Sequence, residues 1–261
     1  MELATPGLLD PLPLWTLFPI TVMVALVSIE LGFKAARYRR ARTVDEPEAP
    51  SAGMVGATLG LLAFMLAFTF GLAGSRFEAR RQLVLTEANA ISTAYLRASL
   101  LPEPMSTDIR ALLREYVDVR LQGMQPDKLK ASIERSEQLH KSLWSQATMA
   151  TEKEKSAITS LFIQSLNQVI DLHSQRITAG LRSRVPAAIW IGLYLLLIFA
   201  MASVGYQEGM SSKRRSIAAI TLVLGFSVVL VLIADLDRPG QGFLSVSQES
   251  MSDVKRTMAE N

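Results

Sequence analysis

The stretch MVGATLGLLAFMLAFTFGLAG, residues 54–74, decides the fold of this chain. It contains no charged residue and has the length of about 20 residues that a helix needs to cross roughly 30 Å of hydrocarbon. Three further apolar blocks of similar length lie at residues 14–33, 185–205 and 216–235. The sequence therefore predicts an all-α membrane protein with four transmembrane helices.

The first apolar block differs from a cleavable signal peptide. A signal peptide begins with a basic segment, whereas the residues before this block include Glu2 and Asp10 and no lysine or arginine. Basic residues follow the block, so we expect it to stay in the membrane. The chain has no cysteine, which excludes disulfides and thiolate metal ligands.

Basic residues indicate which loops are cytoplasmic. Two short loops are rich in them, through Lys34, Arg37, Arg39, Arg40, Arg42, Lys213, Arg214 and Arg215. The positive-inside rule places such loops in the cytoplasm. The N-terminus, residues 76–184 and the C-terminal tail are then predicted to be periplasmic. Basic residues that flank 76–184 favour the reverse, but long segments obey the rule weakly. The net charge of +3 thus reflects topology and not a nucleic-acid partner.

The chain divides into four predicted segments. Residues 1–75 hold the first two spans and a basic cytoplasmic loop, and residues 76–184 form an extramembrane helical bundle. Residues 185–237 hold the last two spans, and residues 238–261 form a tail. Phe243, Leu244 and Val246 are expected to anchor a short amphipathic tail helix along the bundle.

Residues 76–184 have the apolar periodicity of amphipathic helices. The second span is expected to continue into this segment as one helix of about 47 residues, until LPEPM at 101–105 breaks it. A helix closed by Gly123 and Pro126 follows, and the next is expected at about 127–147. Thr151 and Glu154 have the spacing of a capping box for a last helix, which is expected to run toward the third span.

Polar residues within these helices suggest a contact between them. Glu87 and Asn89 interrupt one helix, and Asn167 and Asp171 offer complementary groups on another. A contact between the two sets would fix the register of the helices, which we favour over a ligand site. His140 and His173 lack a neighbouring nitrogen ligand and are interpreted as surface or partly buried histidines.

Two other sets of residues can be interpreted in two ways, as having either a structural or a functional role. The sequence LVLIADLDRPGQG ends the fourth span. Its polar segment either forms a clasp that ties the tip of the helix to the bundle, or forms the mouth of an ion pathway. The residues concerned are Asp235, Asp237, Arg238 and Pro239. The arginines near the bundle are either head-group anchors or an anion funnel; they are Arg76, Arg80, Arg81, Arg182 and Arg184. Glycines of the second span, among them Gly56 and Gly60, indicate close helix packing, within the chain or with another subunit.

No enzyme motif is present: the sequence has no phosphate-binding glycine loop, zinc motif or nucleophile elbow. We therefore expect no catalytic residue, cofactor or metal ion. The expected partners are the lipid bilayer, further copies of the chain, and chloride or another small anion.

Three long motifs carry a family resemblance. They are GATLGLLAFMLAFTFGLAGSRFEARRQLVLTEANAISTAYLRASLLPEP, LFIQSLNQVIDLH and ADLDRPGQGFLSVSQESM. With them the sequence resembles the bestrophin-like domain family, bacterial membrane proteins of unknown function. The resemblance implies four membrane helices per subunit and an oligomeric anion channel. It also implies a cytoplasmic helical part, against the charge pattern of the loops. The alternative function is a non-catalytic sensor or scaffold that binds partners through the bundle.

Overall fold

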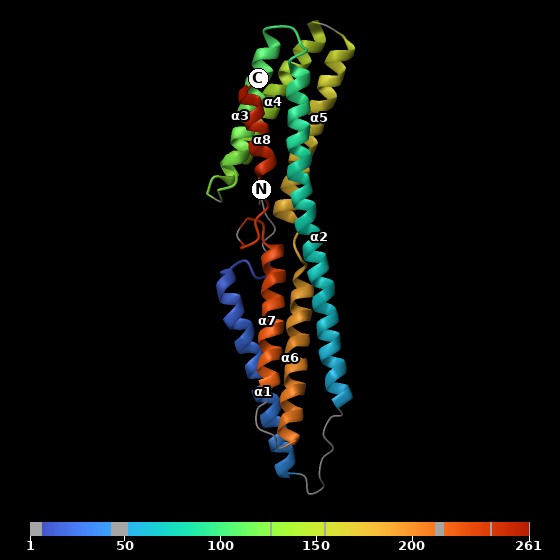
Figure 1. Ribbon diagram of the computed structural model, residues 1–261, viewed down its shortest axis with the longest axis vertical. Helices are drawn as coiled ribbons and strands as arrows, with labels where there is room; N and C mark the ends of the chain where they lie inside the picture. The colour runs from blue at the N-terminus through green and yellow to red at the C-terminus, as the bar shows by residue number, and fades with distance from the viewer. Residues whose placement is uncertain are drawn as a thin grey trace. The chain divides into compact units, whose positions relative to one another are not determined.

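The computed structural model describes residues 7–42, 52–125, 127–153, 155–211, 217–240 and 242–260. Its regular elements within these ranges are all helical (Figure 1). The chain forms two compact units. Met1–Arg76 and Arg184–Leu244 make the membrane unit, and Phe77–Ser183 and Ser245–Asn261 make the bundle unit. The predicted tail of residues 238–261 is thus divided between the two.

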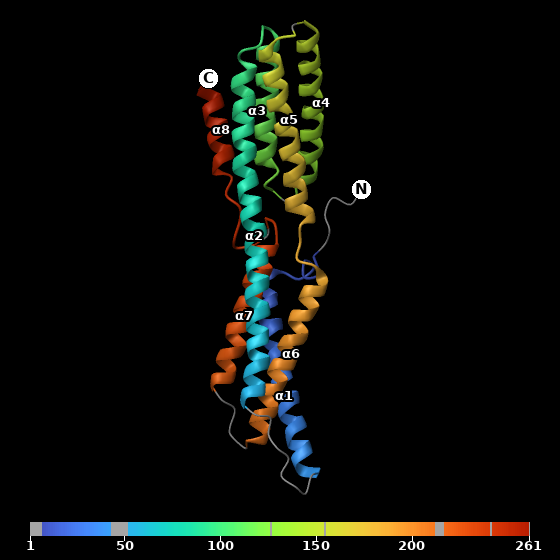
Figure 2. The ribbon, with the colours of Figure 1, turned by 90° about the vertical axis from the view of Figure 1, so that its right-hand side faces the viewer.

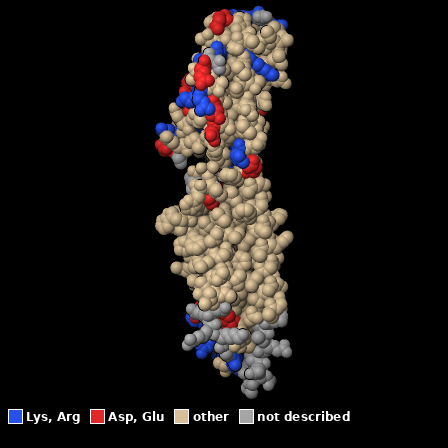
Figure 3. Space-filling view, viewed as in Figure 1, with Lys and Arg blue, Asp and Glu red and all other residues tan. Residues whose placement is uncertain are grey.

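The membrane unit contains α1 (Leu14–Arg42), the first half of α2 (Ala52–Ala98), α6 (Ala187–Met210) and α7 (Ile217–Asp237). These four helices are long and apolar enough to cross a bilayer. Charged side chains are nearly absent from the surface over the middle of this unit (Figure 3). The four-span prediction is therefore confirmed. The first residue of the predicted fourth span, residue 216, lies outside the described residues.

The closest helix packing in the membrane unit joins α1 to α6. A Cβ added to Gly205 would lie 2.0 Å from the carbonyl oxygen of Ile29, and one added to Gly32 would lie 2.0 Å from that of Ala202. Thr21 and Tyr194 hydrogen-bond across the same pair at 3.0 Å. Small residues allow such close approach in lipid. By contrast, Gly56, Gly60, Gly71 and Gly74 of α2 have no atom within 4 Å of an added Cβ, so the predicted glycine packing does not occur within the described chain.

The bundle unit is built from the second half of α2, α3 (Met105–Gln122), α4 (Leu129–Lys153), α5 (Ala157–Ile177) and α8 (Glu249–Glu260), as Figure 2 shows. Its apolar core includes Ile91, Leu113, Leu143 and Phe162. As predicted, the second span and the first bundle helix are one helix of 47 residues that ends before LPEPM. Gly123 caps α3 as expected, and Pro126 lies outside the described residues.

Three local predictions for the bundle are wrong. Thr151 does not begin a helix: it lies inside α4, where its hydroxyl donates to the carbonyl of Ala147. Ser156 instead caps α5, accepting from the amide of Thr159 at 3.2 Å; Glu154 lies outside the described residues. In addition, α5 does not run into α6, because a π-helical turn, η1 (Thr178–Arg182), and an extended segment separate them.

The third wrong prediction concerns the tail. Phe243 is 81% exposed, and the tail helix α8 is anchored instead by Met251 and Met258, which are buried in the core of the bundle unit. Tyr95 and Arg114 both donate to the carbonyl of Met258, and Lys255 pairs with Asp118 at 2.7 Å. The apolar residues just before α8 are therefore not its anchor.

Candidate functional site

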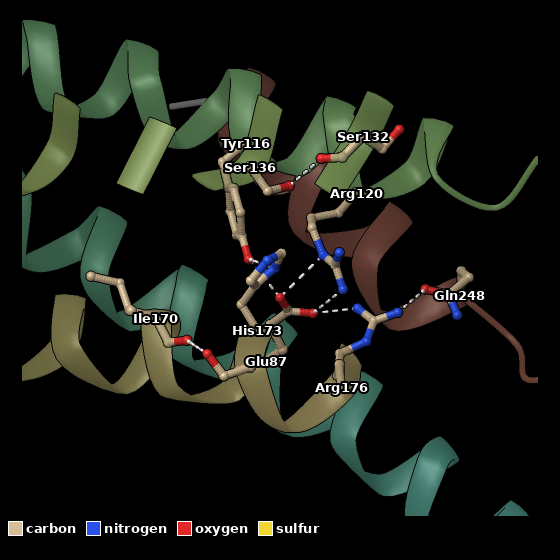
Figure 4. A network of polar contacts seen from close by, with 10 residues as sticks. Glu87, Tyr116, Arg120, Ser132, Ser136, Ile170, His173, Arg176 and Gln248 are labelled. Atoms are coloured by element: carbon tan, nitrogen blue, oxygen red, sulfur yellow. Dashed lines mark hydrogen bonds and ion pairs between the residues drawn. The ribbon is translucent and has the colours of Figure 1, made fainter. Parts of the chain in front are cut away.

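Glu87 is the centre of a buried polar network in the bundle unit (Figure 4). Its side chain, on α2, is fully buried, and α3 presents Tyr116 and Arg120 to it from one face because they are four residues apart. Tyr116 donates to its carboxylate at 2.7 Å, and the guanidinium of Arg120 lies 3.2 Å away. Arg176 of α5 pairs with the same carboxylate and reaches Gln248, just before α8, at 3.3 Å. The network therefore ties three helices and the start of α8 together.

The protonation states follow from burial and from the arginines. Burial alone would raise the pKa of Glu87, but the charges of Arg120 and Arg176 outweigh it and hold that pKa below its usual range. Burial raises the pKa of Tyr116 well above 10, and the neighbouring carboxylate adds to the effect. The cluster thus holds an ionised carboxylate between two guanidinium groups, with a neutral phenol beside them.

Two histidines complete this network. His140 of α4 and His173 of α5 pack edge to face, with ring centroids 4.8 Å apart, and Tyr116 lies against both rings. Burial lowers the pKa of His140 to about 4 and that of His173 to about 3, and nearby Arg120 adds to both shifts. Because the phenol proton goes to Glu87, Nδ1 of His173 is the group that donates to the phenol oxygen, at 3.3 Å. Both rings are neutral core groups.

The predicted polar contact has different partners from those expected. Asn89, Asn167 and Asp171 are all exposed, so they do not meet within the chain. Glu87 does reach α5, but through Arg176. The reason is geometric: Glu87 and Arg176 face the core of the bundle, while Asn89, Asn167 and Asp171 lie on the outer faces of their helices.

Sequence reasoning missed five members of the network, namely Tyr116, Arg120, His140, His173 and Arg176. From the sequence, the two histidines are interpreted as isolated residues, because neither has a nitrogen ligand near it. A usable signal was present, since Tyr116 and Arg120, and His173 and Arg176, fall on the apolar stripes of α3 and α5. A charged side chain on such a stripe is buried when the helix packs, and a buried charge is costly unless it is paired with an opposite charge.

A second polar cluster in the membrane unit contains the predicted clasp residues. Asp237, at the end of α7, accepts a hydrogen bond from the amide of Val185 at 2.8 Å. Arg184 donates to the carbonyl of Asp237 at 2.5 Å, and its Nε lies 3.8 Å from the Asp237 carboxylate. The end of α7 is therefore held against the segment that leads into α6.

The other aspartate of this cluster shapes the turn after α7. Asp235 accepts hydrogen bonds from the amides of Phe243 and Leu244, at 2.7 Å and 3.1 Å. Position 242, beside this carboxylate, requires glycine, because a Cβ on Gly242 would lie 1.9 Å from Oδ1 of Asp235. Pro239 follows directly after the helix and is partly exposed.

Arg238 pairs with the N-terminal segment. It donates to the carbonyl of Leu9, and its Nε lies 3.9 Å from Asp10, which also pairs with Arg184. Sequence reasoning missed Asp10 because its partners are distant in the sequence, Arg184 by 174 residues and Arg238 by 228 residues.

The five arginines of the predicted funnel differ in exposure. Arg81 and Arg182 are exposed, and Arg81 lies 3.5 Å from Glu78. Arg80 is buried, with its guanidinium 6.0 Å from the ring of Phe77, and Arg184 belongs to the cluster just described. Burial makes Arg80 unsuitable as the lining of a water-filled entrance, which is a correction to the predicted set. Arg76, Arg81 and Arg182 remain a prediction.

Sequence comparison identifies the family. The model of the bestrophin-like domain matches residues 20–251. The chain belongs to the bestrophin-like family. No curated protein matches the sequence.

Solved structures agree with this membership at the level of the fold. A crystal structure of a bacterial bestrophin homologue from Klebsiella pneumoniae is 15% identical, with a TM-score of 0.65, and the match covers 94% of this chain and 97% of that one. A variant of that homologue gives a TM-score of 0.68 at 12% identity, covering 92% and 97% of the two chains. The bestrophin-like chain therefore has the architecture of these membrane proteins over nearly its whole length.

Proposed function

We propose that this bestrophin-like protein is an oligomeric channel for chloride or another small anion in a bacterial inner membrane. Membership of the family supports the proposal, and the exposed face of α2 is the observation that carries it. The alternative is a non-catalytic scaffold that binds partners through the bundle unit.

The membrane half of α2 has two different faces. Val55, Leu62, Leu66, Thr69 and Ala73 are buried against the membrane unit. The opposite face exposes Leu61, Phe64 and Phe68, and the backbone at Gly60 and Gly71 is open. A bare glycine backbone in lipid favours close approach of another helix. We infer that this face meets other copies of α2 around a central axis, where the exposed apolar side chains would form a constriction.

The bundle half of α2 has an exposed face that supports the same proposal. Along one face it exposes Gln82, Leu85, Asn89, Thr93 and Leu96, none of which carries a charge, while Glu78 and Arg81 are exposed where this half of the helix begins. Such a face suits an uncharged vestibule, because it neither binds a passing anion tightly nor repels it. Exposed Arg81 and Arg182 would raise the local anion concentration.

The orientation is proposed from the loops. The basic loop after α1 and the loop between α6 and α7 are placed in the cytoplasm, which puts both termini and the bundle unit in the periplasm. The experiment that tests the function is anion flux through the purified oligomer in liposomes. Flux supports the channel, and folded oligomers without flux support the scaffold.

A further inference from the structure

An open groove of about 490 Å³ lies in the membrane unit, next to the clasp cluster. Its walls come from the segment before α1 and from the loop after α7, and they include Asp10, Leu12, Trp15, Arg238 and Phe243. The volume is in the range of small-molecule sites. Neither the channel proposal nor the family assigns it an occupant.

The groove lies where two spanning helices end. Helix α1 begins at Leu14, and α7 ends at Asp237, so the walls continue from hydrocarbon-spanning sequence into polar loops. Two aromatic side chains are highly exposed there, Trp15 at 73% and Phe243 at 81%. An exposed tryptophan at the end of a spanning helix, such as Trp15 at the start of α1, typically lies at the level of the lipid headgroups. The groove is thus open to the headgroup region of the bilayer.

Hydrogen-bond donors in the groove favour a phosphate. Arg238 is only 6% exposed, and it uses Nη2 for the carbonyl of Leu9. Its Nε lies 3.9 Å from Asp10, and the bond to Leu9 is the one hydrogen bond found for its side chain among the residues that the structure describes. The first amides of α1, at Leu14 and Trp15, have no partner inside their helix, and both residues line the groove. The positive end of the helix dipole adds to this attraction for an anion.

The charge balance selects the kind of phosphate. Asp10, Asp235 and Asp237 face two guanidinium groups, Arg184 and Arg238, so the cluster carries one net negative charge. A further net anion would be repelled, whereas a phosphodiester that brings its own ammonium group adds no net charge. Asp10 is 33% exposed and offers that ammonium a carboxylate.

We propose that this groove binds the headgroup of a zwitterionic phospholipid with a primary ammonium. The phosphodiester contacts Arg238 and the first amides of α1, the ammonium lies toward Asp10, and the acyl chains extend past Trp15. The bound lipid fastens the N-terminal segment to the end of α7. This site is independent of whether the oligomer conducts ions.

The test uses the full-length protein in detergent and three probes, namely phosphatidylethanolamine, phosphatidylglycerol and inorganic phosphate. Native mass spectrometry counts bound lipid, and thermal unfolding reports stabilisation. We expect one phosphatidylethanolamine per chain, retained at a concentration roughly tenfold lower than phosphatidylglycerol. Inorganic phosphate should not stabilise the protein.

Variants locate the site without breaking the clasp. Trp15→Ala and Phe243→Ala remove exposed side chains, so both should fold and retain the lipid roughly tenfold more weakly. Phe199→Ala is the matched control, because Phe199 is 60% exposed on α6 and does not line the groove. Equal retention by all three variants would overturn the proposal. Equal binding of the two lipids, or stabilisation by inorganic phosphate alone, would also overturn it.

Discussion

Tyr116 donates a hydrogen bond of 2.7 Å to the carboxylate of Glu87, and both side chains are wholly buried. The phenol comes from α3 and the carboxylate from α2, so this bond joins two helices at the centre of the bundle unit. Arg120 and Arg176 neutralise the carboxylate on its other sides. Glu87 is therefore the group on which the register of the bundle depends.

Replacing Glu87 with glutamine should destabilise the bundle strongly. The substitution keeps the shape of the side chain but leaves the guanidinium groups of Arg120 and Arg176 buried without a counter-charge. Breaking a buried pair in this way costs about 3–5 kcal/mol, which corresponds to a fall in Tm of roughly 10 °C. Asp171→Asn is the control, since Asp171 is exposed on α5 and should change Tm very little. Equal Tm values for the two variants, measured in detergent, would refute the central role of Glu87.

Stability should fall as the solution becomes acidic. The pKa of His140 is lowered to about 4 and that of His173 to about 3, so the unfolded chain, with histidine pKa values near 6.5, binds protons more readily. The contribution of the neutral histidines is complete above pH 6.5 and is lost as the pH falls toward 4 and below. Glu87, whose pKa is below 4.5, adds a loss of the same sign at lower pH.

Thermal unfolding between pH 8 and pH 4 measures this dependence. The double variant His140→Gln/His173→Gln should show a flatter curve between pH 6.5 and pH 5 than the unchanged protein. A wild-type Tm that stays constant over this range would contradict the neutral, buried state of the two rings.

The packing of α1 on α6 should not tolerate an added methyl group. Gly205→Ala places a Cβ against the backbone of Ile29, and since backbone cannot move aside as a side chain does, the helices must separate. Such overpacking costs about 1–3 kcal/mol. Gly192→Ala on the same helix adds its methyl group to open space and is the matched control. The account predicts a lower Tm for Gly205→Ala alone, and an unchanged Tm for both variants would contradict it.

The sequence predicted the helices better than it predicted their partners. The four spans and the break at LPEPM depend on local features, namely uncharged runs such as 54–74 and a pair of prolines, and these were placed correctly, whereas the break between α5 and α6 was not predicted. The sequence pointed to Glu87 as one side of a polar contact between helices, but it did not indicate Arg120 and Arg176 as the partners. That choice depends on how α3 and α5 are rotated about their axes, which a single sequence does not specify.

The glycines also show that a single sequence does not specify which helices pack against each other. The glycine spacing in α2 predicts close packing within the chain or with another subunit; within the described chain the close approach occurs instead at Gly32 and Gly205, which are 173 residues apart, and packing of α2 on another subunit remains a prediction. The clasp at the end of α7 remains a prediction, and the contact of Arg238 with Asp10 was not foreseen, because the start of α1 and the end of α7 meet only in the folded unit. Contacts between distant segments therefore accounted for most of the errors.

The orientation can be measured with reporters fused in the connection between α3 and α4, near residue 128. The basic loops predict a periplasmic bundle, so an alkaline phosphatase fused there should be active, and a cytoplasmic fluorescent reporter should not. The reverse pattern would place the bundle in the cytoplasm, the location implied by the resemblance to bestrophins. A fusion within the loop between α6 and α7 gives the opposite result and serves as the control.

Chloride flux through the reconstituted oligomer shows whether this protein conducts anions. The purified protein is first shown to be a folded oligomer by light scattering, and chloride release from loaded liposomes is then measured. The account predicts release well above that from protein-free liposomes, and a smaller release for Arg182→Glu at low salt, with the difference shrinking as salt screens the charge. Folded oligomers that release no more chloride than protein-free liposomes would contradict the assignment of this bestrophin-like protein as an anion channel.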